Sequence, residues 1–183
     1  MKKSIRIASL LAFAIANTAF INQALAADSL NIDIHAATEQ GQGAHLGKIT
    51  VEETAYGLLF TPHLKDLAPG IHGFHIHDKP DCGPSTDAQG KVTPAGAAGG
   101  HMDSEKTDKH LGPYNQEGHL GDLPAVYVDA DGTAAYPVLA PKLTKVSQIK
   151  NRSIMIHAGG DNHSDDPAPL GGGGARMACG VIK

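Results

Sequence analysis

The sequence contains no tryptophan, and aromatic residues make up only 4% of its 183 residues. It also lacks any stretch in which apolar residues recur with a helical period over three turns. The missing helical period argues against a domain built mainly from amphipathic helices, and the low aromatic content fits a β-rich domain. The 22 glycines are instead typical of a β-rich chain in which short strands are joined by many turns.

Positive charge is scarce after the first 26 residues. Residues 27–183 carry 12 lysines and arginines against 19 aspartates and glutamates, which gives a net charge of −7. This balance argues against nucleic acid or an anionic membrane surface as a partner. An anionic substrate would have to be attracted by a local positive field that opposes the overall charge.

The first 26 residues have the three parts of a secretory signal peptide. A basic start is followed by an apolar stretch, residues 7–21, and by an Ala-Leu-Ala cleavage motif at residues 24–26. A membrane anchor is the alternative, but the apolar stretch is short and is interrupted by Asn17 and Thr18. We therefore expect cleavage before Ala27, export to the periplasm and no membrane association afterwards.

Cysteine is also scarce, with only Cys82 and Cys179 in the chain. In a cytosolic protein both would be expected to stay as thiols, whereas in an exported protein a single disulfide is the better expectation. In the chain-entropy view, a bridge across a loop of this size stabilises the fold by up to about 4–5 kcal/mol.

Eight short segments have the alternating pattern of half-buried strands and are separated by turn residues. They are residues 30–34, 47–51, 56–61, 71–77, 125–129, 133–139, 152–157 and 177–182. Without a repeat or linker, residues 27–183 are expected to form one all-β domain, an eight-stranded antiparallel Greek-key β-barrel or sandwich. Residues 78–121 and 159–175 lack strand patterns, and connections this long in a compact domain are usually functional loops.

Two histidines alternate along one of these predicted strands. His75 and His77 lie on one face of the segment GFHIH, because successive side chains of a strand point to opposite faces. Phe74 and Ile76 lie on the other face, toward the expected core. A single histidine is usually a hydrogen-bonded core residue, but two adjacent imidazoles become compatible when a metal accepts their lone pairs. The pair therefore indicates a metal site.

The long loop that follows contains three more histidines and an aspartate, at His101, His110, His119 and Asp122. Three imidazoles and one carboxylate form a complete four-coordinate set for zinc. Because this set leaves no open position, such a zinc would organise the loop rather than attack a substrate. Three unrelated solvent-exposed histidines are the alternative.

A further histidine, His157, ends the predicted strand 152–157. Together with His75 and His77 it offers three imidazoles at strand ends with space beside them, and this arrangement suits a redox-active copper. Spacing alone does not assign the six histidines to two separate metals.

In combination, the motifs GFHIH, AGGH, IMIHAGGD and GGGGARMACGVI resemble those of the secreted bacterial copper–zinc superoxide dismutases. The similarity covers essentially all of residues 28–183. It implies a β-sandwich or barrel, copper and zinc as cofactors, and superoxide as the small-molecule substrate. The implied reaction converts two superoxide radicals to dioxygen and hydrogen peroxide.

The resemblance assigns roles to the matching positions of this chain. The implied copper ligands are His75, His77, His101 and His157. The implied zinc ligands are His101, His110, His119 and Asp122, so that His101 bridges the two metals. The remaining matches are Asp161, which hydrogen-bonds histidines of both sites, Arg176 beside the copper, the disulfide Cys82–Cys179, and His72 as a structural histidine.

In the family pattern the catalytic residues are His101, which supplies a proton to the departing peroxide, and Arg176, which holds the anion. A non-enzymatic periplasmic copper- or zinc-binding protein on the same fold is the first alternative, and the presence of both residues argues against it. A zinc hydrolase is the second. It would need an open zinc position and a general base, whereas the apparent zinc set is complete.

Two further expectations concern the surface. Lys106 and Lys109 are the candidates for the local field that guides superoxide toward Arg176, with ordinary solvated loop lysines as the alternative. A homodimer is possible. Residues 111–114 stand where several bacterial relatives have an aromatic-rich segment, so the resemblance does not define a subunit interface for this chain.

Overall fold

The computed structural model describes residues 29–183. The predicted signal peptide, residues 1–26, lies outside this range. Within it, no helix is long and apolar enough to cross a membrane. The helical elements among the described residues are single 3₁₀ turns: η1 (Gly96–Ala98), η2 (Val146–Gln148) and η3 (Leu170–Gly172).

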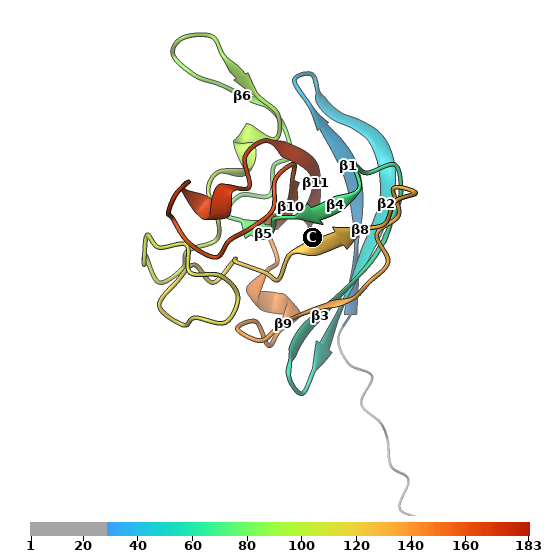
Figure 1. Ribbon diagram of the computed structural model, residues 1–183, viewed down its shortest axis with the longest axis vertical. Coiled ribbons are helices and arrows are strands. Elements are labelled where there is room, and N and C mark those ends of the chain that lie inside the picture. The colour runs from blue at the N-terminus through green and yellow to red at the C-terminus, as the bar shows by residue number, and fades with distance from the viewer. Residues whose placement is uncertain (1–28) are drawn as a thin grey trace, which may run out of the picture.

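A seven-stranded antiparallel sheet curls around the core in the order β5-β10-β11-β1-β2-β3-β9. Its strands are β1 (Ser29–Thr38), β2 (Gly41–Thr54), β3 (Gly57–Leu64), β5 (Phe74–His77), β9 (Val138–Ala140), β10 (Arg152–His157) and β11 (Arg176–Ile182). A separate pair, β4 (Gly70–His72) and β8 (Val126–Val128), lies in front of the curved wall of β1–β3 in the view of Figure 1. The predicted all-β antiparallel fold is confirmed, as a curled half-barrel.

The number of strands differs from the eight that were predicted. The predicted strand 71–77 is divided at Gly73 into β4 and β5. The reason is a change of partner, because Gly73 N–H donates to Gly159 O at 2.8 Å and Gly73 O accepts from His157 N–H at 2.8 Å. The backbone thereby leaves the β4–β8 pair and enters the large sheet.

Two other predicted segments also need correction. A short hairpin of β6 (Ser85–Thr86) and β7 (Val92–Thr93) forms within residues 78–121, where no strand was predicted. The predicted strand 133–139 is regular only at its end, in β9, and Ala134 makes an isolated bridge to Leu64. These elements are too short for a periodic pattern to reveal them.

Alternating side chains from both walls of the half-barrel fill one core. Ile32 and Ile34 of β1 are buried in it, and so are Phe74 and Ile76 of β5. Phe74 meets Phe60 of β3 edge to face, with ring centroids 5.8 Å apart. The inward direction of Phe74 and Ile76 confirms the predicted alternation, and it leaves the histidines of β5 on the outer side.

Two long segments cover that outer side. The ligand loop, residues 101–122, and the closing loop, residues 158–175, lie on the same side of the half-barrel, beyond β5 (Figure 1). The segment before the ligand loop is fastened by a disulfide between Cys82 and Cys179, whose Cα atoms are 5.8 Å apart. This bridge ties the segment to β11 and confirms the predicted pairing. Around it lies a second small core of Cys82, Ala95, Ala98, Met155 and Cys179.

Candidate metal centre

Two adjacent strands bring three histidines to the outer side of the sheet. His75 and His77 are on β5, which pairs with β10, and β10 ends at His157. The bond from His157 N–H to Gly73 O holds the end of β10 beside the start of β5. All three imidazoles are buried, because the ligand loop and the closing loop cover them.

The ligand loop attaches its two ends along β5. Ile76 N–H donates to Gly121 O at 2.9 Å, and Met102 N–H donates to Ile76 O at 2.7 Å. Gly121 has no room for a side chain, because a Cβ there would overlap Ile76 O. The resulting isolated bridges place ligands side by side: Asp122 opposite His75, and His101 opposite His77.

One ring nitrogen of each strand histidine faces an acceptor. His77 Nδ1 and His157 Nδ1 lie 2.9 and 3.2 Å from backbone carbonyl oxygens. His75 Nε2 lies 2.7 Å from a carboxylate oxygen of Asp161. A neutral imidazole has a single N–H, so each ring donates through this nitrogen and keeps a lone pair on the other.

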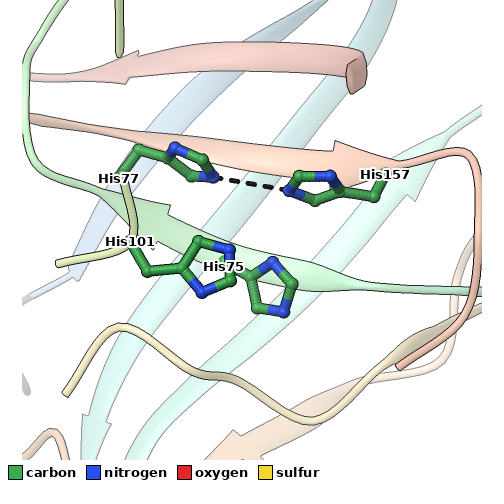
Figure 2. Close-up of side chains that lie close together, drawn as sticks. All are labelled: His75, His77, His101 and His157. Atoms are coloured by element: carbon green, nitrogen blue, oxygen red, sulfur yellow. Dashed lines mark hydrogen bonds between the residues drawn. The ribbon is translucent and has the colours of Figure 1, made fainter. Parts of the chain in front are cut away.

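The remaining nitrogens face a shared space, where four histidines meet (Figure 2). His77 Nε2 and His157 Nε2 are 3.4 Å apart, the contact that is dashed in Figure 2. When both rings donate from Nδ1, this contact joins two lone pairs and is not a hydrogen bond. His75 Nδ1 and His101 Nε2 are buried there without a hydrogen-bond partner. Four converging lone pairs without a donor fit a bound cation, and imidazole suits copper.

A second set converges on one carboxylate oxygen. Asp122 Oδ1 lies 3.0 Å from His101 Nδ1, 3.1 Å from His110 Nδ1 and 3.4 Å from His119 Nδ1. Ligand atoms of a tetrahedral zinc with bonds of about 2.0–2.1 Å are separated by about 3.3 Å. Asp122 Oδ2 and the Nδ1 atoms of His110 and His119 are buried without hydrogen-bond partners. Of the four groups, the ligand atoms of His101, His110 and Asp122 lie within 4.8 Å of one another, whereas His119 approaches Asp122 Oδ1 but falls outside this tight group. The set therefore fits a tetrahedral zinc once the His119 ring moves toward the other three.

The two sets adjoin at His101, whose ring stacks on that of His75 with centroids 3.9 Å apart. Because the sites are so close, His75 also falls within the tight group formed by His101, His110 and Asp122. Its Nε2 is occupied by Asp161, so the unpartnered Nδ1 is the atom that His75 has left for a metal.

Asp161 links the two sets through its two oxygens. Its Oδ2 lies 2.7 Å from His75 Nε2, and its Oδ1 lies 2.8 Å from His110 Nε2. Gly171 packs directly against this contact with φ +70°, and a Cβ there would overlap the Asp161 carboxylate. The closing loop thus supplies both the bridging carboxylate and the space that it needs.

Burial and neighbouring charges shift the pKa of His110 in the opposite direction from the pKa values of the strand histidines. Burial lowers the pKa of His75 to about 3, of His77 to about 2 and of His157 to about 4. These rings are neutral near pH 7, and their lone pairs are available to a metal. Burial also acts to lower the pKa of His110, but the nearby carboxylates of Asp122 and Asp161, 3.1 and 2.8 Å from its two ring nitrogens, outweigh burial and raise the pKa to about 9. A metal ion at His110 must therefore displace a proton.

Arg176 begins β11 opposite His157. Its guanidinium donates to Ala95 O and Gly99 O, both at 2.6 Å. Gly99 O also faces His77 Nδ1, so the arginine and the strand histidine share one acceptor. Burial lowers the pKa of Arg176, but a guanidinium stays protonated in proteins. A fixed positive charge thus stands beside the copper-type set.

A surface cavity of about 310 Å³ reaches Arg176. It is lined by Lys91, Val92, Thr93, Pro94, Gly174, Ala175 and Arg176. Lys106 and Lys109 are exposed on the ligand loop and do not line this cavity. Lys91, which the sequence reasoning did not select, adds the second positive charge to the cavity wall. The only feature of the sequence that could have indicated this role for Lys91 is its position between Cys82 and His101.

The antiparallel half-barrel and two adjoining metal-type sites with a shared histidine define a binuclear metalloprotein of the all-β class. Residues 45–182 match the family described as copper/zinc superoxide dismutase (SODC). The chain belongs to the copper/zinc superoxide dismutase family. It is an oxidoreductase that acts on superoxide and uses copper and zinc as cofactors.

Named relatives are similar over most of the chain. "Superoxide dismutase [Cu-Zn] 1" of Salmonella typhimurium is 58% identical over 160 residues, which cover 87% of this chain and 90% of that protein. "Superoxide dismutase [Cu-Zn]" of Haemophilus ducreyi is 53% identical over 156 residues, which cover 85% of this chain and 78% of the relative.

Solved structures agree with this similarity. The copper/zinc superoxide dismutase from Brucella abortus superposes with a TM-score of 0.83 at 48% identity, over 85% of this chain and 100% of that one. The monomeric copper, zinc superoxide dismutase from Salmonella enterica gives a TM-score of 0.77 at 52% identity, with the same coverage.

Proposed function

We propose that dismutation takes place at a copper held by His75, His77, His101 and His157, beside a zinc held by His101, His110, His119 and Asp122. The observation that carries this assignment is the position of His101. Its Nδ1 lies 3.0 Å from Asp122 Oδ1, within the zinc-type set, and its Nε2 is buried without a partner in the copper-type set. One imidazole thus offers a nitrogen to each site.

Copper, when bound, supplies the one-electron redox couple that the reaction needs. One superoxide gives up an electron and becomes dioxygen, and a second superoxide takes an electron and two protons and becomes hydrogen peroxide. Arg176 attracts and orients the anion by charge and hydrogen bonds. His101 Nε2 is the atom placed to hold one proton and pass it to the departing product. Its Nδ1 is fixed on the zinc side, so the ring keeps its place.

The direct test combines metal analysis with measurement of superoxide consumption. Purified protein loaded with both metals should hold one copper and one zinc per chain and consume superoxide rapidly. Arg176→Ala should keep both metals and lose much of kcat/KM, because it removes the anion contact and leaves every proposed ligand in place. Bound metals without superoxide consumption would indicate a non-enzymatic metal-binding protein. Zinc-dependent ester hydrolysis without copper would indicate a hydrolase.

We further propose that residues 1–26 are a signal peptide and that residues 27–183 are the mature domain in the periplasm. The basic start, the apolar stretch and the Ala-Leu-Ala motif support this assignment. Mass spectrometry of the protein from a periplasmic fraction should find Ala27 as the first residue. A mass that corresponds to the full chain would contradict the proposal.

A homodimer stays a prediction. Ile71 on β4 is paired with Tyr127 on β8, and Tyr136 lies beside Tyr127 with ring centroids 5.9 Å apart. All three side chains are exposed, and grouped exposed apolar side chains are typical of protein contacts. Sedimentation velocity should find a dimer that Tyr127→Lys dissociates, and a wild-type monomer across micromolar concentrations would contradict the prediction.

A further inference from the structure

Lys142 makes an unusual contact with the ligand loop. It lies between β9 and η2, and its Nζ donates to three backbone carbonyl oxygens. The distances are 2.9 Å to Gly112 O, 3.2 Å to Asn115 O and 2.6 Å to His119 O. A lysine ammonium has three N–H donors and no acceptor. All three donors of Lys142 are thus used by one loop.

The three acceptors lie in irregular backbone, where no strand or helix supplies donors to them. Gly112 has φ +73°, and residues 103–121 contain no regular element. In the described part of the chain, the loop itself supplies no donor to Gly112 O or Asn115 O, and His119 O accepts within the loop only from Asp122 N–H at 3.3 Å. Lys142 therefore provides hydrogen bonds that a loop of this kind cannot provide for itself.

The base of Lys142 is fixed to the barrel. The next residue, Leu143, is fully buried, and its carbonyl accepts from Leu58 N–H on β3 at 2.7 Å. The ammonium thus extends from the edge of the sheet to the ligand loop. Irregular loops of this kind move more than the strands that they connect. It also stands within the electrostatic reach of Asp122. The lysine connects the core to the backbone of a zinc-type ligand.

The shortest of the three bonds is made to a proposed ligand residue itself. His119 O accepts from Lys142 Nζ at 2.6 Å and from Asp122 N–H. His119 O thus accepts from two donors, one of which is the backbone N–H of Asp122, so it lies in the short turn that connects two of the four zinc-type residues. Holding this oxygen restrains the backbone from which the His119 ring and the Asp122 carboxylate extend.

We propose that Lys142 is a positioning residue of the zinc site: it holds the backbone of residues 112–119 against the barrel, so that His119 and Asp122 are in place before the metal arrives. This inference rests on the zinc assignment proposed above. A pre-formed site loses less conformational freedom on binding, so zinc binds more tightly. The strand-held histidines His75, His77 and His157 do not depend on this lysine.

The test replaces Lys142 with Met, which is unbranched and one atom shorter than lysine and has no hydrogen-bond donor. Zinc affinity is measured by chelator competition on copper-free protein, and cobalt(II) replaces zinc to give a visible absorption spectrum of the site. We expect Lys142→Met to weaken zinc binding about tenfold, the lower end of the effect of losing a partner that orients a ligand. The cobalt spectrum should change, and copper affinity should stay as in the wild type.

Two variants serve as comparisons. Lys142→Arg keeps donors in a rigid fork and should restore part of the affinity. Lys145→Met changes a lysine of the same segment whose Nζ bonds Glu53 at 2.7 Å, and it should leave zinc affinity and spectrum unchanged. If Lys142→Met does not fold, Lys142→Gln takes its place with the same expected loss.

An unchanged zinc affinity and cobalt spectrum in Lys142→Met, with only a lower melting temperature, would overturn the inference, because Lys142 would then stabilise the fold without positioning ligands. The zinc assignment is tested separately by His110→Ala. If that variant binds zinc as the wild type does, the assignment itself fails, and the inference fails with it.

Discussion

Asp161 occupies a position at which one residue affects both metal sites. Each of its carboxylate oxygens accepts from a different imidazole, His75 on one side and His110 on the other. A carboxylate is required there, because both ring nitrogens donate and an acceptor must face each of them. Partners of this kind fix the tautomer and the direction of a metal-binding ring.

We therefore expect Asp161→Asn to weaken one of the two sites. An amide has only one acceptor oxygen, so its NH₂ group must face one of the two N–H donors. The affinity for the metal on that side should fall about 10–100-fold, as measured by chelator competition for each metal. The matched control is Asp166→Asn, an exposed aspartate of the same loop, which should leave both affinities unchanged. Equal affinities in Asp161→Asn and the wild type would contradict the proposed role.

The assignment of each ligand to a metal has its own prediction. His110→Ala removes one of four proposed zinc ligands and none of the proposed copper ligands. Zinc should be lost first when the variant is dialysed against a chelator, and copper should stay bound. Elemental analysis of the dialysed protein decides the matter. Copper lost with zinc retained would show that the two metals are assigned the wrong way round.

At the scale of elements, the disulfide fixes the segment that holds Arg176, the proposed anion contact. Residues 83–99 provide Ala95 O and Gly99 O, the two acceptors of the Arg176 guanidinium. Cys82 and Cys179 connect the start of this segment to β11. Loss of the bridge should therefore affect both the stability of the fold and the place of Arg176.

We expect Cys82→Ser to lower the melting temperature and the superoxide-consuming activity together. The chain-entropy estimate for a loop of this size is up to about 4–5 kcal/mol of unfolding free energy. Thermal unfolding and activity are measured under oxidising conditions, and the double variant Cys82→Ser/Cys179→Ser controls for the remaining thiol. Unchanged melting and activity would mean that hydrogen bonds and the small core around Ala95 and Met155 are sufficient.

Alternation in the sequence predicted the long strands because their residues are buried on one face only. It placed Phe74 and Ile76 inward, as the structure has them. It did not predict that the ends of the ligand loop lie along β5, because this contact uses backbone bonds and a close approach at Gly121. Neither of these leaves a periodic pattern. The three carbonyl contacts of Lys142 were hidden for the same reason.

For the whole molecule, the residues of the metal centre could be predicted from the sequence only because several family motifs occur together in it. His75 and His77 are separated from His157 by about half the chain. No periodic pattern in the sequence indicates that these histidines lie close together in the fold. The family resemblance supplies the grouping that spacing does not. The cavity beside Arg176 was not predictable in this way, because it is formed by two segments, residues 91–94 and 174–176, whose contact depends on the fold.

The whole molecule also sets the problem of attracting an anion to a chain with a net charge of −7 over residues 27–183. Lys106 and Lys109 were selected from their place in the ligand loop, and we retain them as a proposal. Lys91 is a stronger candidate for attracting the anion than these two lysines, because it lines the same cavity as Arg176. Charges are screened over about 8–10 Å near physiological salt, so a lysine that lines the cavity should contribute more than the lysines outside it.

We expect Lys91→Gln to lower the second-order rate of superoxide consumption severalfold at low salt and to flatten its dependence on ionic strength. Lys106→Gln/Lys109→Gln should have the same effect to a smaller extent. Lys48→Gln removes the same charge from the exposed face of β2 and controls for net charge. Rates are measured by pulse radiolysis from low to high salt on protein with both metals bound. If Lys91→Gln and Lys48→Gln have the same rate and the same salt slope, the local field comes from Arg176 alone and the lysines are ordinary solvated charges.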